Sequence, residues 1–269
     1  MKFSKKMMFG AVALMMAASL VFTGCRDEEG SADVNISWGN NGNTATVLGT
    51  NDSDDLYARN FSTMRTKHID YTATATWNKG NAGVIGVMFG MSKNADETYN
   101  FGVVGLSDAA GTNPRYYVNH YVNVDPVSMV GSASDFTNKD GKAAWVDADC
   151  PWKDLKGITA DEDGNFTVAI KVALKGNEGE DGYYEVTLGT ELEEDGTIKA
   201  ANKIASAEVG KKTKFTDKNG KNVKYSGTDG EDSTQTDVGV YANVYTGKSL
   251  SAKVAFADIR KYDDVADGE

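Results

Sequence analysis

The sequence has few of the residues that build metal centres, disulfides and thiol nucleophiles. Among its 269 residues there are two cysteines, two histidines and three prolines. A structural zinc site takes about four nitrogen or sulfur ligands, so this chain could not assemble one without carboxylates. If Cys25 is used for another purpose, Cys150 has no partner and an internal disulfide is excluded. A hydrophobic core must then stabilise the fold, and the chain is long enough to bury one.

Cys150 and the histidines, His68 and His120, are the remaining candidates for nucleophilic catalysis. Cys150 follows Asp147 and Asp149 closely in the sequence. Neighbouring carboxylates disfavour the thiolate, which is the reactive form of cysteine. His120 falls on the aliphatic side of a predicted strand, where a core or rim position is expected. We therefore interpret Cys150 as structural or incidental and His120 as non-catalytic.

Basic residues are outnumbered by acidic ones. The chain has 28 Lys and Arg against 39 Asp and Glu, a net charge of −11. Residues 1–24 contain three lysines and no acidic residue, so the remainder has 25 basic and 39 acidic residues and a net charge of −14. Such a surface repels nucleic acid and anionic lipid. We predict no nucleic-acid partner and no electrostatic adhesion to a membrane.

No known catalytic motif is present. Hydrolysis of a glycoside requires two carboxylates on either side of the scissile bond, and the acidic run Glu191–Asp195 has the wrong spacing and enters a predicted turn. The sequence has no serine nucleophile elbow, no phosphate-binding glycine loop and no dinucleotide fingerprint. We predict that the chain is not an enzyme. A sugar-modifying enzyme with dispersed acidic residues is the catalytic alternative.

The first 25 residues have the pattern of an export signal. Three lysines within residues 1–6 precede an apolar run, Met7–Phe22, and Thr-Gly-Cys25 follows. A basic start, a short apolar region and a small residue before the cleavage site are typical of a signal peptide. The run is shorter than the roughly 20 residues of a membrane-spanning helix. The cysteine makes the segment resemble a bacterial lipoprotein leader, although Phe22 stands where leucine is usual. An ordinary secretory signal with a nearby cysteine is the alternative.

In such lipoproteins the cysteine becomes the acylated N-terminus. The resemblance implies a signal peptide at 1–24, an acylated polar tether at 25–32 with the lipid on Cys25, a domain at 33–262 and a tail at 263–269. Each buried methylene of an acyl chain contributes about 0.8 kcal/mol, so several chains would hold the domain on a bilayer. We expect a location in the cell envelope, on the outer or the inner membrane.

The rest of the chain is predicted to be β-structure. Ile69–Trp77 and Phe166–Leu174 alternate apolar and polar residues with the period of two that marks a strand with one buried face. Val84–Met91 is apolar throughout, as expected of a central strand covered on both sides. Further strands are predicted at Asp33–Trp38, Thr44–Leu48, Leu56–Phe61, Tyr99–Leu106, Tyr116–Val124, Tyr183–Leu188, Lys203–Val209, Val238–Tyr245 and Ala252–Tyr262.

Helix is expected only in short turns, at Val127–Phe136 or at Trp152–Gly157. Gly, Asn and Asp clusters between the apolar runs favour tight hairpins. About a dozen short strands joined by such turns predict an all-β fold, an antiparallel β-sandwich. No Pro-rich linker and no repeat divides the chain, so we predict a single domain.

The order of these strands resembles one family of sandwiches. A Thr-rich strand ending at Trp77 is followed by Gly-Val-Met-Phe-Gly (86–90) and Tyr-Asn-Phe-Gly-Val (99–103), and Asp237–Tyr241 leads to a closing strand, Ala252–Ile259. This order resembles the concanavalin A-like lectin and glucanase fold, particularly laminin G-like and keto-disaccharide-hydrolase-like domains. The resemblance implies a jelly-roll with one convex and one concave sheet, with glycan binding common on the concave side. The Glu-x-Asp-x-x-Glu motif of the glucanase branch is absent.

Two acidic loops are candidates for calcium. Asp161–Asn165 has oxygen ligands and a glycine, but an EF-hand would need flanking helices and a Glu at its twelfth position, where Val172 stands. Asn51–Asp55 is a second acidic loop that could join a calcium site of the kind found in laminin G-like folds. Each loop has a simpler interpretation as a polar turn. We predict no metal and no cofactor, with calcium as the alternative.

Two predicted strands carry the same aromatic and polar pattern. Tyr-x-Asn-x-Tyr occurs at 117–121 and at 241–245, and alternation places each triplet on one face, about 13 Å long at roughly 3.3 Å per residue. Tyrosine rings suit the apolar faces of sugars, and asparagine both donates to and accepts from hydroxyl groups. A plain outer sheet surface would show the same pattern. The predicted ligand-binding residues are Arg115, Tyr117, Asn119, Tyr121, Tyr241, Asn243 and Tyr245.

The sequence therefore predicts a membrane-anchored lipoprotein with a non-catalytic, carbohydrate-binding sandwich. The alternative is an adhesin or other interaction module that contacts an envelope or host protein without binding glycan. Trp145 and Trp152 lie on either side of Cys150 and could rim a pocket.

Overall fold

The computed structural model describes residues 32–39, 42–65, 70–80, 83–108, 113–133, 135–146, 152–225 and 236–257. Several predicted features lie outside these ranges: the signal peptide, the acylated tether with Cys25, residues 263–269, His68 and Cys150. Within the described ranges, no helix combines the length and the hydropathy that crossing a bilayer would require.

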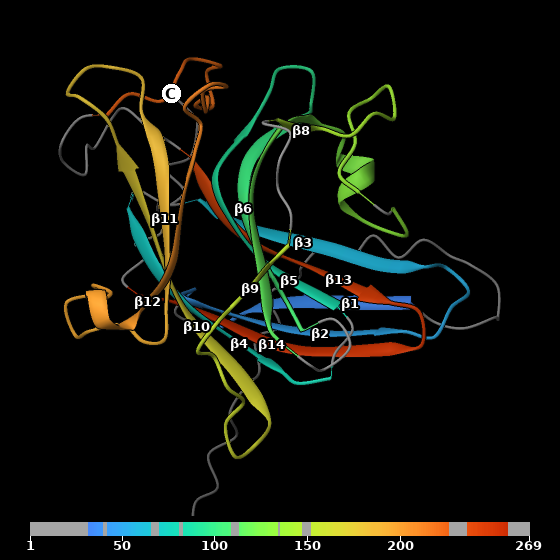
Figure 1. Cartoon of the computed structure of the whole chain (residues 1–269). Helices are drawn as coiled ribbons and strands as arrows, with labels where there is room; N and C mark the ends of the chain where they lie inside the picture. Colours follow the sequence, from blue (N-terminus) through green and yellow to red (C-terminus); the bar gives the residue numbers. More distant parts are fainter. Residues whose placement is uncertain are drawn as a thin grey trace, which may run out of the picture.

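The described residues form two antiparallel sheets that pack face to face (Figure 1). The strands are β1 (Ala32–Trp38), β2 (Thr44–Asn51), β3 (Tyr57–Arg65), β4 (Tyr71–Asn78), β5 (Gly83–Lys93), β6 (Tyr99–Ser107), β7 (Arg115–Val124), β8 (Trp145–Val146), β9 (Lys153–Asp154), β10 (Asn165–Lys175), β11 (Tyr183–Gly189), β12 (Lys203–Val209), β13 (Asp237–Tyr245) and β14 (Lys248–Ala257). The first sheet has the order β1–β2–β14–β4–β10–β11–β12. The second has the order β3–β13–β5–β6–β7–β8, with β9 also paired to β7. The predicted all-β antiparallel sandwich is confirmed.

The period of two explains which strands form and which way their side chains point. In β2 every second residue from Ala45 to Asn51 is buried, and the residues between them are exposed. β5 is different, because ten of its eleven residues are buried. It lies between β13 and β6 with both faces covered, which confirms the central strand predicted from its apolar sequence.

The main core lies between the two sheets. It is mostly aliphatic, and Val47, Val168 and Val240 are fully buried in it. Trp77 packs on Phe166 with 5.7 Å between ring centroids. This core covers the inner face of the second sheet. The outer face of that sheet lies outside this core.

The short helices match the prediction in one place and differ in another. A 3-10 helix, η1 (Pro126–Met129), begins the segment predicted to turn at Val127–Phe136. At Trp152–Gly157 the prediction is wrong, because the chain forms β9 there and pairs with the start of β7. A second 3-10 helix, η2 (Ala200–Asn202), was not predicted. Pairing with a neighbouring strand overrides local preference in so short a segment.

Candidate functional site

The two Tyr-x-Asn-x-Tyr triplets lie on the outer face of the second sheet, the side that faces away from the first sheet. In β13, Val240 belongs to the main core and Tyr241 to a second buried cluster. In β7, Tyr116 belongs to the main core and Tyr117 to that second cluster. Alternation along each strand therefore places both triplets on one face.

Tyr117 and Tyr241 meet above the middle of the outer face. Tyr241 is paired with Gly86, Gly86 with Gly105, and Gly105 with Tyr117, so one row of residues crosses four neighbouring strands. The two rings lie over the two glycines from opposite ends of this row. Their hydroxyl oxygens are 2.5 Å apart and share a hydrogen bond.

The two glycines are what allow the tyrosine rings to lie flat on the sheet. A Cβ atom at Gly86 would be 1.9 Å from the ring of Tyr241, and one at Gly105 would be 2.1 Å from the ring of Tyr117. Neither glycine has a positive φ angle, so space rather than backbone conformation requires them. Any larger residue at either position would displace a ring from its place.

A segment between β7 and β8 covers this face. We call it the strap, residues 125–133 and 135–146, which contains η1 and ends in β8. Met129, Phe136 and Ala144 of the strap are buried in one cluster with the two tyrosines. The ring of Phe136 meets that of Tyr241 edge-on, with 5.2 Å between centroids. The tyrosine pair is thus the floor of a second, smaller core.

Arg59 of β3 fixes the strap across the whole width of the sheet. Its backbone N–H donates to the carbonyl of Gly131 (2.8 Å), and the N–H of Gly131 donates back to Arg59 (3.0 Å). The buried guanidinium donates to the carbonyl of Ser128 (3.0 Å) and lies 4.7 Å from the centroid of the Phe136 ring. A desolvated cation over an aromatic face adds to the stability of this contact.

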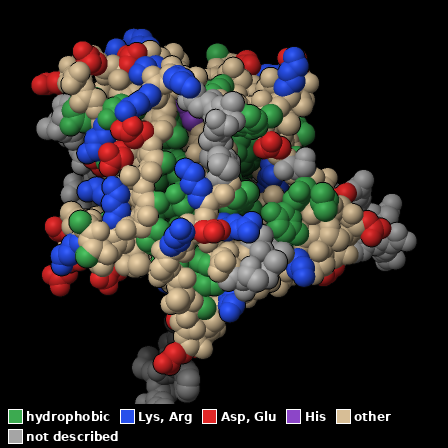
Figure 2. Space-filling view, in the orientation of Figure 1, with side chains coloured by type: hydrophobic (Ala, Val, Ile, Leu, Met, Phe, Trp, Pro, Cys, Tyr) green, Lys and Arg blue, Asp and Glu red, His purple; other side chains and the backbone are tan. Residues whose placement is uncertain are grey.

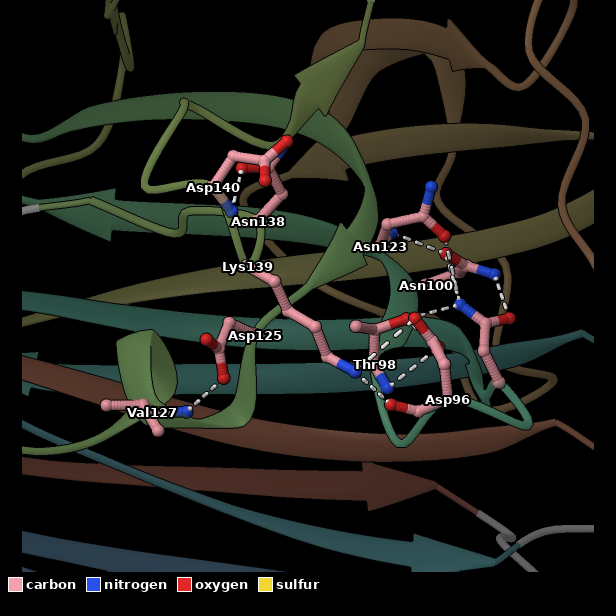
Figure 3. Close-up of polar contacts among 10 residues, drawn as sticks. Asp96, Thr98, Asn100, Asn123, Asp125, Val127, Asn138, Lys139 and Asp140 are labelled. Carbon is pink, nitrogen blue, oxygen red and sulfur yellow. Dashed lines mark hydrogen bonds and ion pairs between the residues drawn. The ribbon is translucent and has the colours of Figure 1, made fainter.

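A second contact ties the strap to the hairpin between β5 and β6 (Figure 3). Lys139 donates to the backbone carbonyl of Asp96, and its ammonium is 3.5 Å from the Asp96 carboxylate. The hydroxyl of Thr98 donates to the same carboxylate (2.6 Å) and lowers its pKa. Close by, the backbone N–H of Asn123 donates to the side chain of Asn100 (2.8 Å). These polar groups satisfy one another and hold the strap at the end of the sheet.

The strap decides which of the seven predicted residues a ligand could reach. Arg115 is exposed, and Asn119 and Tyr245 are half-buried. The other four are buried: Tyr117, Tyr121, Tyr241 and Asn243. Binding through these seven residues stays a prediction, but contact with the buried four would require the strap to move.

Burial also sets the protonation of the tyrosine pair. Desolvation raises the pKa of Tyr241 to about 12 and raises the pKa of Tyr117 well above its usual value. Both are therefore neutral hydroxyl groups at physiological pH. One donates to the other, and neither is available as a base.

β7 is bordered by two short strands, which pair with different parts of it. Val146 of β8 pairs with His120, and Lys153 of β9 pairs with Tyr116. From residue 146 to 153 the chain advances by seven positions, while β7 advances by four from 116 to 120. Residues 147–151, between these two strands, lie outside the described ranges.

One tryptophan, Trp145, lies in β8, and another, Trp152, directly precedes β9. Trp145 is 37% exposed and is paired with Tyr121, and Trp152 is 40% exposed. Trp152 packs edge-on against Tyr117 with 4.7 Å between ring centroids. Tyr117 and Tyr121 are about 13 Å apart along the strand. We call the solvent-accessible part of this region the β7 edge: Arg115, Asn119, Trp145 and Trp152.

Polar groups accompany the tryptophans. The amide of Asn119 donates to the hydroxyl of Tyr121 (3.2 Å), and the Nε atom of Arg115 lies 3.6 Å from a carboxylate oxygen of Asp154. In the middle of Figure 2, where β9 lies in Figure 1, basic and acidic side chains gather beside hydrophobic ones. The β7 edge thus combines exposed aromatic rings with an amide and a charged pair.

Tyr245 shares the outer face but lies away from the β7 edge. Its ring packs against Tyr57 of β3, with 5.3 Å between centroids. β5 and β6 separate its strand, β13, from β7. The structure therefore does not bring the accessible members of the two triplets into one site.

His120 belongs to the main core side of β7, where its place on the aliphatic face predicts it. The residue is 1% exposed, and its ring stacks on Phe215 at 3.8 Å between centroids. Burial lowers its pKa to about 4, although the backbone of Thr213 acts in the opposite direction. His120 is therefore neutral at physiological pH and does not face the β7 edge.

The acidic loops considered for calcium are ordered by their own hydrogen bonds. The Asp161 carboxylate accepts from the backbone N–H of Asn165 (2.7 Å), as in a tight turn. In the other loop, the Asn51 side chain accepts from the hydroxyl of Ser53 (2.7 Å). Among the described residues, no group of three or more His, Cys, Asp or Glu side chains could hold a metal ion.

No local sequence pattern predicts the contact between Arg59 and Phe136, because these residues are 77 positions apart in the sequence. For the exposed tryptophans, Trp145 and Trp152, the sequence predicts only the rim of a pocket. No protein family model matches this chain, and no curated protein matches it.

Proposed function

We propose that the chain is an exported lipoprotein, acylated at Cys25, whose concanavalin A-like sandwich binds glycan without catalysis at the β7 edge. The observation that carries the glycan proposal is the pair of exposed tryptophans, Trp145 and Trp152, on either side of Asn119. The lipobox-like Thr-Gly-Cys25 after a short apolar run supports the anchor.

The chemistry of the edge fits a sugar chain. The apolar faces of sugar rings pack on exposed aromatic side chains, and Tyr or Trp gives large contact area at a low cost in conformational entropy. Asn119 has an amide that both donates and accepts, and Arg115 offers further donors. The spacing along β7 gives the two aromatic positions room for more than one contact on an extended ligand.

Binding without hydrolysis is proposed because of the carboxylates. A glycosidase needs two of them flanking the scissile bond. Among the described residues, one carboxylate, that of Asp154, contacts the β7 edge, with an oxygen 3.6 Å from the Nε atom of Arg115. Incubation with a panel of oligosaccharides checks this point, and product formation that is lost in Asp154→Asn would establish the enzymatic alternative.

A protein partner is the second candidate, favoured by a different surface. Val127 is 74% exposed and Val130 is 40% exposed, both on the strap. Exposed apolar side chains close together are typical of protein interfaces. Capture of a protein partner that is lost in Val127→Asp, together with a blank glycan array, would favour this function over glycan binding.

The glycan proposal is tested by titration on a glycan array followed by calorimetry. Trp145→Ala and Trp152→Ala should each weaken binding at least about tenfold, which corresponds to 1.4 kcal/mol. Val127→Ala is the control, because it removes a still more exposed apolar side chain from the strap, away from the β7 edge. Unchanged affinity in both tryptophan variants would overturn the assignment of the site.

The anchor is tested separately. Wild-type protein should incorporate labelled palmitate and fractionate with membranes, whereas Cys25→Ala should do neither. Recovery of unacylated wild-type protein from the soluble fraction would contradict the anchor and would leave the glycan test unaffected.

A further inference from the structure

We propose that the sandwich stands on the membrane with one defined end toward the lipid. This proximal end consists of Asn51–Leu56 and Thr246–Lys248, and the proposal rests on the acylation of Cys25 proposed above. Six residues separate Cys25 from Ala32, where β1 begins. Seven consecutive Cα–Cα steps span at most about 25 Å. Ala32 therefore stays within that distance of the lipid-bearing residue.

The register of the first sheet places Ala32 at the proximal end. Ala32 is paired with Asn51 of β2, and Asn51 is paired with Lys248 of β14. Directly paired Cα atoms are about 4.5–5.5 Å apart, so Lys248 lies about 10 Å from Ala32. The turn between β13 and β14, which connects the two sheets, is at this same end.

The proximal end is one rigid unit. The Asn51 side chain is fully buried, and its amide donates to the carbonyls of Asp55 (3.0 Å) and Val244 (3.1 Å). Its oxygen accepts from Ser53 (2.7 Å), and the hydroxyl of Thr246 also donates to Asp55 (2.6 Å). A limit on the position of Ala32 is therefore a limit on this whole end of the sandwich.

The opposite end lies a full strand length away. β5 begins at Gly83, which pairs with Val244 at the proximal end, and reaches Ser92 nine residues later. Nine residues of strand extend about 30 Å. The hydroxyl of Ser92 is hydrogen-bonded to Thr216 (3.2 Å), in the hairpin that carries the exposed Lys221. Lys221 is thus about 30 Å further along the strand axis than the proximal end.

The proximal end faces the bilayer without inserting into it. Asp52 and Asp54 are exposed beside Leu56, which is 62% exposed. Carboxylates are repelled by the negative potential of anionic lipid over about one Debye length, roughly 8 Å in physiological salt. The tether then holds the domain close to the surface while these charges keep it from settling on it. The β7 edge runs along the strand axis and remains open from the side.

Energy transfer from a dye to an acceptor on lipid headgroups tests this orientation. The full acylated chain carries Cys150→Ser, and the dye is attached through either Lys248→Cys or Lys221→Cys. Both are exposed lysines near turns, so the two variants are matched in chemistry. In vesicles of neutral lipid the transfer efficiency should be higher from position 248 than from position 221. Vesicles with anionic lipid at low salt should reduce transfer from 248, and added salt should restore it.

Equal transfer from the two positions, or higher transfer from 221, would overturn the proposed orientation. The Cys25→Ala version of each labelled protein separates this result from a failure of the anchor. If the acylated protein itself does not float with vesicles, the anchor is wrong. If it floats but the two positions transfer equally, the anchor holds and the orientation is wrong.

Discussion

The two faces of β7 are both largely buried, but different parts of the chain bury them. On the inner face, Tyr116 belongs to the core between the sheets, and His120 stacks on Phe215, from the connection between β12 and β13. On the outer face, Tyr117 and Tyr121 lie under Phe136 from the strap. The inner face is thus covered by the core of the sandwich together with that connection, whereas the outer face is covered by the strap. Alternation along a strand therefore assigns a face but not what covers it.

Two tryptophans beside β7 are partly exposed, and the proposed site lies there. The strap reaches from β7 to Arg59 on β3, but it leaves Trp145 and Trp152 exposed beside β7. Aromatic residues on one face thus divide into a buried floor and an open edge. The floor contributes stability, and the edge is available to a ligand.

The largest loss of stability is expected from truncating Phe136, the strap residue that packs on the outer face of the second sheet. Phe136→Ala should lower the free energy of unfolding by about 3–5 kcal/mol, the usual range for a buried phenylalanine. Its ring is 2% exposed and packs against Tyr121 and Tyr241. Urea denaturation measures the loss. Val127→Ala, on the same strap but exposed, should change stability by less than about 0.5 kcal/mol, and equal losses would contradict the role of Phe136.

The burial of His120 on the inner face of β7 is tested by measuring stability as a function of pH. Because burial lowers the pKa of His120 from 6.5 to about 4, the unfolded chain takes up a proton before the folded protein does. Stability should therefore fall as the pH decreases from about 6.5 to about 4, by up to about 3 kcal/mol from this residue. Urea denaturation at several pH values measures the slope.

The control for this experiment is His120→Gln, whose side chain does not titrate. Carboxylates titrate in both proteins, so only the difference between the two pH profiles reports on His120. Parallel profiles would show that the inner face does not hold a neutral histidine.

A smaller loss of stability is expected when a side chain is added at Gly86, beneath the ring of Tyr241. Gly86→Ala places a methyl group against the ring of Tyr241 and should destabilise the protein by about 1–3 kcal/mol. In the double variant Gly86→Ala/Tyr241→Ala the clash is absent. The double variant should therefore lose less stability than the sum of the losses in Gly86→Ala and Tyr241→Ala. Strict additivity would show that the ring does not lie over Gly86.

Much of the fold follows from the sequence because its signals are local. The period of two at Phe166–Leu174 and the apolar run at Val84–Met91 each correspond to an observed strand. Turn residues between them mark the hairpins. These features depend on neighbours one or two positions apart, so no knowledge of distant contacts is needed.

The candidate site follows from the sequence only in part, because its burial depends on distant contacts. Tyr117 and Tyr241 have the pattern of an exposed sheet surface, yet they are buried. Their burial requires the register of four strands, which aligns them with Gly86 and Gly105, and a strap that returns across the sheet. A single-strand pattern contains neither piece of information.

The most direct test compares an exposed residue of the β7 edge, Trp152, with a residue buried beneath the strap, Tyr241. Trp152→Ala and Tyr241→Phe should both remain folded, with losses of about 1 kcal/mol for the ring contact and for the buried hydrogen bond. Glycan titration of the two variants beside wild type is the measurement. We predict that Trp152→Ala loses binding while Tyr241→Phe binds like wild type. Retained binding in Trp152→Ala with loss in Tyr241→Phe would contradict it.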